Sequence, residues 1–348
     1  MEATGDEEHW TPIPKNDRRL VATETVPTRG SLALSWTADR SGKWLFHCHI
    51  LFHISADLRL TPDAHATHEA SGLHHMAGLV LGITVTSSKS ASAPAQPMRY
   101  LRLAVGQREG VNLNGDPGLG YRLEDSIQAH RNLSSAFTAP GPPIVLTRGE
   151  PVEIAIENQL REATSVHWHG IELESYYDGV PGWGGDDRHI TPPIRPSETF
   201  VARFTPPRAG TFIYHTHLND YVQLSTGLYG PLIVVEPGER FDPDVDKVFV
   251  LSRGGTDNEK DPFLINGTAT PGAVHLLAGK RYRFRIIGIV PNPVLDVQLE
   301  RDGEPVEWRP IAKDGVTLPL RQALQRPASL TVNPGETFDF EYRSLSSG

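Results

Sequence analysis

Short segments of alternating apolar and polar residues recur along this chain and predict β-strands, whereas helical periodicity is scarce. Gly, Pro and Asp residues bound most of these segments, as expected for strands joined by turns. The predicted strands are Ser31–Trp36, Trp44–His49, Leu79–Thr86, Arg99–Val105, Val152–Glu157, Val166–Leu173, Thr199–Phe204, Gly210–His215, Leu232–Glu236, Lys247–Leu251, Tyr282–Ile287 and Thr337–Tyr342. Such spacing is typical of antiparallel β-sandwiches with long loops.

Two interruptions of this pattern divide the chain into three pieces. Residues 87–97 (SSKSASAPAQP) are small and polar and contain Pro, so we predict a linker there. A second boundary follows a completed strand, and the pieces are 1–86, 98–237 and 246–348. Only the middle piece has the length and the number of strands of a whole sandwich, so we expect the first and last domains to be incomplete.

Composition agrees with a turn-rich chain and excludes some partners. The 348 residues include 32 Gly and 29 Pro, and 42 acidic against 33 basic residues give a net charge of −9 without a basic block. We therefore expect no nucleic-acid partner and no binding to an anionic membrane surface. The longest apolar run, Ala77–Val85, is too short to span a bilayer. The single Cys cannot form an internal disulfide, which leaves packing, nucleophilic or metal chemistry.

Histidines separated by one residue occur three times among the 15 His of the chain. Random placement would give roughly 0.6 such pairs. The pairs are His47 and His49, His167 and His169, and His215 and His217. Alternate residues of a strand point to the same face, so each pair can bind one metal ion or two neighbouring ones.

Cys48 lies between the first two histidines and, on a strand, would point to the opposite face. His53 follows five residues later. A thiolate and imidazoles with a weak axial ligand describe a blue-copper electron-transfer site, whereas clustered imidazoles suit oxygen-reactive copper. Zinc is the main rival metal, but structural zinc prefers several Cys ligands. An electron taken up at Cys48 can then pass along its backbone to metals bound by His47 and His49.

HCHILFH at 47–53, HWHG at 167–170 and YHTH at 214–217 together resemble the motifs of the multicopper oxidases of the laccase and ceruloplasmin type. The resemblance implies tandem cupredoxin domains, which are all-β Greek-key sandwiches, and copper in type 1, type 2 and binuclear type 3 sites. The implied ligands are Cys48 and His53 for type 1, His167 for type 2, His169, His215 and His49 for one type 3 copper, and His217 and His47 for the other.

The same resemblance indicates a proton relay and leaves the axial ligand open. Asp178, in YYDGVPG, resembles an Asp near the type 2 copper where a carboxylate can relay protons to reduced oxygen; a turn Asp before Gly is the alternative. Residues 54–74 read as an insertion after the type 1 histidine, so Leu58, Met76 and Leu79 all remain axial candidates. His65, His68 and His74 of the insertion, and His75 directly after it, are predicted to lie in a solvated loop or, alternatively, to bind extra metal. His74 or His75 is also the alternative to His53 as the type 1 ligand.

The sequence departs from the family's pattern in two ways. No His-x-x-His-x-His motif is present, although in the family this motif gives one ligand to each type of copper. The HCH motif also comes first, and His167 follows Cys48 by 119 residues. We expect a truncated chain, whose copper sites are completed by a missing N-terminal portion or by a second copy in a homo-oligomer.

The resemblance implies a segment of an oxidase that couples one-electron oxidation of a reducing substrate at the type 1 copper to four-electron reduction of dioxygen to water at a trinuclear cluster. Its partners would be dioxygen and an unidentified reductant, in the periplasm or outside the cell, although the N-terminus lacks a signal pattern. The alternative is a copper-binding cupredoxin module, or an incomplete fragment, without turnover. A copper nitrite reductase has the same fold, but His49 directly after Cys48 argues against it.

Overall fold

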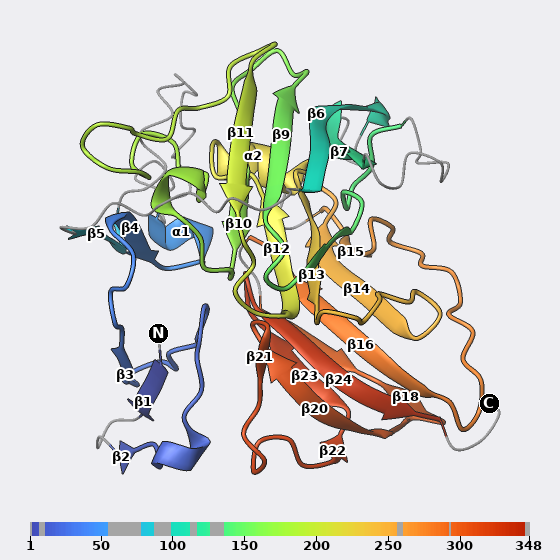
Figure 1. Ribbon diagram of the computed structural model, residues 1–348. Helices are drawn as coiled ribbons and strands as arrows, with labels where there is room; N and C mark the ends of the chain where they lie inside the picture. Colours follow the sequence, from blue (N-terminus) through green and yellow to red (C-terminus); the bar gives the residue numbers. More distant parts are fainter. Residues whose placement is uncertain are drawn as a thin grey trace.

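The computed structural model describes residues 2–6, 11–54, 78–86, 99–111, 117–125, 136–255, 260–291 and 294–344. The expected linker 87–97, two axial candidates (Leu58 and Met76) and the inserted histidines lie outside the described residues. The described chain consists mainly of β-strands, which confirms the all-β prediction (Figure 1). No helix among these residues is long and apolar enough to cross a membrane.

Every predicted strand overlaps an observed one. These strands are β3 (Leu32–Ser35), β4 (Gly42–His47), β5 (Val80–Val85), β6 (Arg99–Val111), β9 (Val152–Asn158), β10 (His167–His169), β11 (Thr199–Phe204), β12 (Gly210–His215), β13 (Tyr229–Val235), β14 (Asp246–Arg253), β16 (Arg281–Gly288) and β24 (Thr337–Arg343).

The pattern did not predict the remaining elements, several of which are only two to four residues long. The strands are β1 (Glu2–Asp6), β2 (Thr11–Pro12), β7 (Pro117–Asp125), β8 (Ile144–Thr147), β15 (Phe263–Ile265), β17 (Leu295–Gln298), β18 (Glu300–Arg301), β19 (Glu304–Pro305), β20 (Glu307–Lys313), β21 (Val316–Thr317), β22 (Arg326–Pro327) and β23 (Ser329–Val332). The helical turns are η1 (Lys15–Asp17), α1 (Leu51–Ile54), η2 (Ser175–Tyr177) and α2 (Asp220–Ser225).

The strand boundaries at the histidine pairs correct one prediction. Cys48 and His49 do not lie on a strand, because β4 ends at His47 and the chain turns into α1. The amide of Cys48 still donates to the Leu79 carbonyl, so Cys48 stays beside the start of β5, the strand that pairs with β4. His217 likewise follows the end of β12. Of the three pairs, only His167 and His169 lie within one strand.

Two sheets, β11-β9-β6-β7 and β10-β12-β13-β8, pack face to face as a sandwich in the middle of the molecule. The alternation in β9 shows why these sequences form strands. Val152, Ile154 and Ile156 are buried in the shared core, while the residues between them are only half-buried. Burial of every second side chain is the pattern of a strand with one face on a core.

The sheet that carries the histidines is buried on both faces. All residues of β12 are buried: Phe212 and Tyr214 face the sandwich core, while Ile213 belongs to a second apolar cluster with Val250 of β14 and Ile287 of β16. The strands β14 and β16 belong to the third sheet, β15-β14-β16-β24-β20-β21, and they pack against β13 and β12 of the sandwich (Figure 1). This packing brings the loops of the third sheet to the histidine end of the sandwich.

The N-terminal part contains the small sheet β2-β1-β3 and the β4–β5 hairpin. Its hairpin contacts the middle sandwich through the loop that contains η2. The buried Ser175 hydroxyl donates to the Lys43 carbonyl and accepts from the amides of Lys43 and Gly185, and the Lys43 amide also donates to the Gly185 carbonyl. These bonds fix the hairpin, and with it the HCH motif, against the sandwich. The exact domain boundaries stay a prediction.

Candidate metal centre

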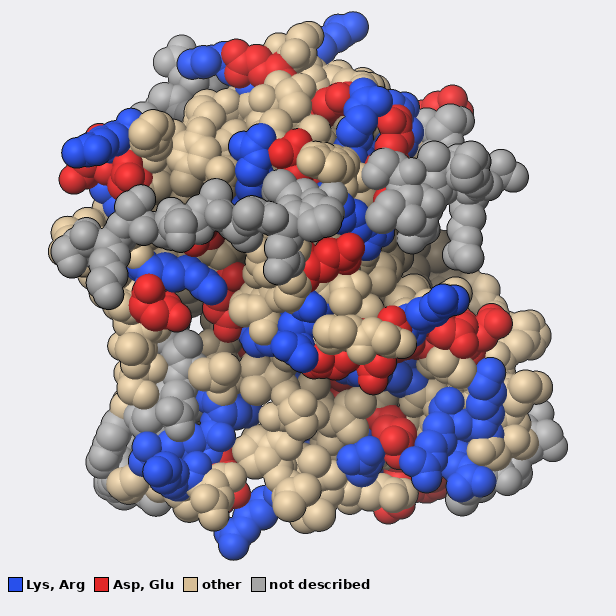
Figure 2. Space-filling model, viewed as in Figure 1, with Lys and Arg blue, Asp and Glu red and all other residues tan. Residues whose placement is uncertain are grey.

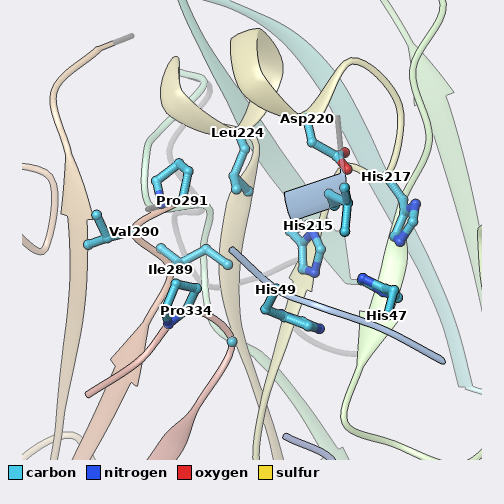
Figure 3. Close-up of a pocket in the computed structure, with 12 residues that line it drawn as sticks. His47, His49, His215, His217, Asp220, Leu224, Ile289, Val290, Pro291 and Pro334 are labelled. Carbon is cyan, nitrogen blue, oxygen red and sulfur yellow. The ribbon is translucent and has the colours of Figure 1, made fainter. Parts of the chain in front are cut away.

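The six histidines of the three pairs form one continuous cluster of imidazole rings. Ring centroids lie 4.9 Å apart for His47 and His49, 4.7 Å for His49 and His169, and 5.6 Å for His47 and His217. The rings of His169 and His215 are 5.7 Å apart, and that of His167 lies within 5.7 Å of His169, His215 and His217. Figure 3 shows His47, His49, His215 and His217 around a cavity that is also lined by Asp220 and Gly335. Residues far apart in sequence thus meet at one place.

Three of the rings are oriented by backbone carbonyls. Nδ1 of His47 lies 2.9 Å from the Cys48 carbonyl oxygen, Nδ1 of His167 lies 2.7 Å from that of Asp178, and Nδ1 of His215 lies 2.5 Å from that of Thr216. Because a carbonyl only accepts, each Nδ1 carries the proton and each Nε2 keeps its lone pair. Such a bond to the second ring nitrogen is how proteins orient a metal-binding histidine.

The other side of the cluster is formed by two segments that no motif indicated. The Thr23 hydroxyl lies 3.2 Å from Nε2 of His169. Gly335, in the loop between β23 and β24, lies so close that a Cβ there would overlap Nδ1 of His49 and come within 3.3 Å of Cε1 of His169. Its φ of +83° is also one that favours glycine. Sequence reasoning missed both residues, and only the turn sequence Asn-Pro-Gly-Glu marked Gly335 as special.

Burial keeps five of the six rings neutral. It lowers the pKa of His47 and of His217 to about 4, with the neighbouring histidines adding to the effect. Burial and neighbouring imidazoles also hold the pKa of His49, His169 and His215 well below the ordinary value. A neutral imidazole is the form that binds a metal ion, so the cluster is prepared for one at neutral pH.

His167 is the exception, and Asp178 is the cause. Burial lowers the pKa of His167, but the charge of Asp178 and the hydrogen bonds made to it more than offset this, so the pKa is raised. Asp178 Oδ1 lies 3.4 Å from Nδ1 of His167. The structure therefore brings the predicted relay residue into contact with one ring of the cluster.

Cys48 and His53 form a second possible metal site beside the cluster. Sγ of Cys48 lies 3.3 Å from Nδ1 of His53, so one metal ion can contact both atoms. Of the three axial candidates, Leu79 lies in the described part of the chain. Its carbonyl accepts from the Cys48 amide, and its amide donates to the His53 carbonyl. The Leu79 backbone is thus bonded to both Cys48 and His53, while its side chain is 62% exposed.

A ligand set assembled from distances differs in part from the one implied by resemblance. One ring nitrogen from each of His167, His169 and His215 lies within 4.8 Å of the other two, which makes these three a possible ligand group in the described chain. The resemblance instead joins His49 to His169 and His215. The centroid distance of 4.7 Å between His49 and His169 is compatible with that grouping as well.

Charge on the surface is mixed. On the face shown in Figure 2, Lys and Arg side chains lie among Asp and Glu side chains over most of the described surface. Surface charges of the described chain also form ion pairs, as in Arg102 with Glu124 and Glu157, and Arg309 with Glu341.

Two segments of the chain, residues 129–239 and 3–61, match two family models that are both described as multicopper oxidase. Among curated relatives, Copper resistance protein A of Pseudomonas syringae pv. tomato is 36% identical over 63% of this chain and 33% of its own length. Laccase-1 of Cryptococcus neoformans var. grubii is 28% identical over 57% of this chain and 36% of its own length. The chain thus spans about a third of the length of these relatives.

Solved structures show the same fold. A multi-copper oxidase from Pseudomonas thermotolerans superposes with a TM-score of 0.56 at 24% identity, over 73% of this chain and 60% of its own. The Blue Copper Oxidase from Nitrosomonas europaea superposes with a TM-score of 0.54 at 23% identity, over 72% of this chain and 76% of its own.

Proposed function

The chain belongs to the multicopper oxidase family, and from that premise we propose that its histidine cluster and its Cys48–His53 pair bind copper. We further propose that the copper-loaded sites couple oxidation of a reducing substrate to reduction of dioxygen to water. One observation carries this proposal: histidines of the HCH motif and of the two later pairs, from separate parts of the chain, meet in a single cluster.

The donors present fit copper. Imidazoles held neutral by burial, with a thiolate and a further imidazole alongside, are the ligands that copper sites use. Nδ1 of His217 is buried and has no hydrogen-bond partner in the described part of the chain. A buried polar atom without a partner is costly, and a bound metal ion is one way to satisfy the ring that carries it.

The ring contacts support the assignment that the resemblance implies. The His169 ring lies next to those of His49 and His215, and these three would hold one type 3 copper, while His47 and His217 would hold the other. The supported assignment for the remaining sites is His167 for type 2, and Cys48 with His53 for type 1. Leu79 is the proposed axial neighbour of the type 1 site. Leu58 and Met76, the other two axial candidates, lie outside the described residues.

When bound, copper would supply the one-electron redox chemistry and the reaction with dioxygen. The chain provides the connection between the two sites. Cys48 is bonded in sequence to His47 and His49, and its carbonyl also accepts the Nδ1 proton of His47, so a covalent and a hydrogen-bonded route both lead from Sγ to the cluster. Asp178 would hold and donate protons beside His167.

The partners and location proposed are dioxygen, a reducing substrate of unidentified chemistry, and the periplasm or extracellular space. The sequence lacks the His-x-x-His-x-His motif, so the copper sites would be completed by ligands from outside these residues or by other side chains of a second copy of the chain.

The test is copper loading of the purified chain. We expect binding with an intense thiolate-to-metal absorption band, loss of cluster copper in His215→Ala, and no loss in the control His189→Ala, whose side chain is 77% exposed. Cys48→Ser is expected to remove the band and leave cluster copper in place. Substoichiometric, colourless binding without oxygen consumption would instead favour the copper-binding module, which the missing motif also supports.

A further inference from the structure

Thr23 lies in an irregular segment, residues 21–25, that contacts the end of β20 next to the histidine cluster. Both backbone groups of Thr23 are held by consecutive residues at the end of β20. The Thr23 amide donates to Oδ2 of Asp314 at 3.0 Å, and its carbonyl accepts from Nζ of Lys313 at 3.1 Å. The position of the residue is therefore fixed from two sides, across 291 and 290 residues of sequence.

The residues that hold Thr23 belong to a buried group of charges. Lys313, Asp314 and Glu336 are 5%, 3% and 2% exposed. Nζ of Lys313 lies 2.8 Å from a carboxylate oxygen of Glu336 and 3.0 Å from one of Glu24. Burying these charges costs desolvation free energy that a well-packed apolar core would not cost. The charge group therefore contributes less to the stability of the fold than to fixing one arrangement of the segments that it joins.

Glu336 connects this charge group to the other segment that contacts the histidines. While its Oε1 pairs with Lys313, its Oε2 accepts from the Asn333 amide at 2.8 Å and closes the turn that contains Gly335. Gly335 lies against His49 and His169. One buried ion pair thus holds both neighbours of His169, the Thr23 hydroxyl and the Gly335 backbone.

We propose that Thr23, held by the buried Lys313–Glu336–Asp314 group, is a positioning residue that fixes the His169 ring for metal binding. The Thr23 hydroxyl lies 3.2 Å from Nε2 of His169, which restrains rotation of the ring and engages one of its two nitrogens. Partners of this kind tune the affinity of a metal site although they never touch the metal. The proposal rests on the proposed function to the extent that His169 is a copper ligand.

Thr25 provides a matched control in the same segment. Its hydroxyl donates to Oε1 of Glu336 at 3.3 Å and accepts from Nδ2 of Asn333, but in the described structure it is bonded to no histidine. Thr23→Val and Thr25→Val each remove one hydroxyl at nearly constant volume. The first takes the hydroxyl away from His169 and keeps the backbone contacts to Lys313 and Asp314, while the second takes it away from Glu336 of the charge group. Only the first removes a contact to the cluster.

The experiment titrates the metal-free full chain and its variants with Cu²⁺, and follows unfolding in denaturant alongside. We expect Thr23→Val to weaken copper binding about 10-fold or more, and Thr23→Ser to restore it, because loss of a histidine-orienting partner usually costs 10- to 100-fold. Thr25→Val should bind copper as the unmodified chain does. Unchanged affinity in Thr23→Val, or an equal loss in Thr25→Val, would overturn the proposal.

A second measurement needs no copper. The ring ¹⁵N signals of His169 in the metal-free chain, identified by their absence in His169→Gln, should shift in Thr23→Val and stay in place in Thr25→Val. Unshifted signals in Thr23→Val would also overturn the proposal. If the unmodified chain bound no copper at all, the proposed function would fail, while these ring signals would still decide whether Thr23 positions His169.

Discussion

Replacing Gly335 by alanine is the sharpest steric test of the cluster. A Cβ at this position would overlap Nδ1 of His49 and lie 2.7 Å from its Cε1, whereas ordinary contacts begin at 3.4 Å. His49 would therefore have to move by about 0.7 Å or more, and a metal site tolerates displacements of only about 0.5 Å. We expect Gly335→Ala to weaken copper binding by about 10-fold or more, a loss like that caused by removing a residue that orients a metal-binding histidine.

Gly303 is the matched control. It has the same φ of +83° in the turn between β18 and β19, and a Cβ there would meet nothing within 4 Å. Both alanine variants carry the cost of a left-handed residue, about 1 kcal/mol. Only Gly335→Ala adds overpacking, which typically costs 1–3 kcal/mol. The assay compares urea unfolding and Cu²⁺ titration of the two variants. Equal copper affinity in both would refute the claim that the Gly335 turn sets the position of His49.

Three further predictions follow from the same contacts. Because the pKa of His217 is about 4 in the folded chain and 6.5 when unfolded, the unfolded chain binds the extra proton. The metal-free protein should therefore lose stability as pH falls from 7 towards 4, by about 3 kcal/mol from this residue alone, and pH-independent urea unfolding would contradict it. Ser175→Ala should cost about 2 kcal/mol, because the buried Gly185 amide loses its acceptor and the Lys43 carbonyl loses its donor, whereas exposed Ser329→Ala should cost under 0.5 kcal/mol in the same assay. Asp178→Asn should slow oxygen consumption by about 100-fold in the copper-loaded chain while copper content is unchanged, and an unaltered rate would remove Asp178 from the proton relay.

The strands and the histidine pairs could be predicted from sequence because both are local signals. Alternation in Val152–Glu157 reports burial of one strand face, and a spacing of two residues brings His167 and His169 to the same side. The same local reasoning placed Cys48 on a strand, which is wrong. The turn into α1 begins after His47, and nothing in the alternation marks that point.

The surroundings of the cluster could not be predicted because they depend on contacts across most of the chain. Thr23 is 146 residues from His169, and Lys313 is 290 residues from Thr23. Ser175 reaches Lys43 across 132 residues. None of these residues has a neighbour in sequence that hints at its partner, and a Thr in an irregular segment usually only forms local bonds. Tertiary packing alone reveals them.

Crystals of the copper-loaded chain, examined by anomalous diffraction at the copper absorption edge, would test the central claim most directly. We predict anomalous peaks among the six imidazoles of the cluster and a separate peak between Cys48 and His53. Absence of copper from the cluster, or copper bound only at exposed histidines such as His189, would contradict the account.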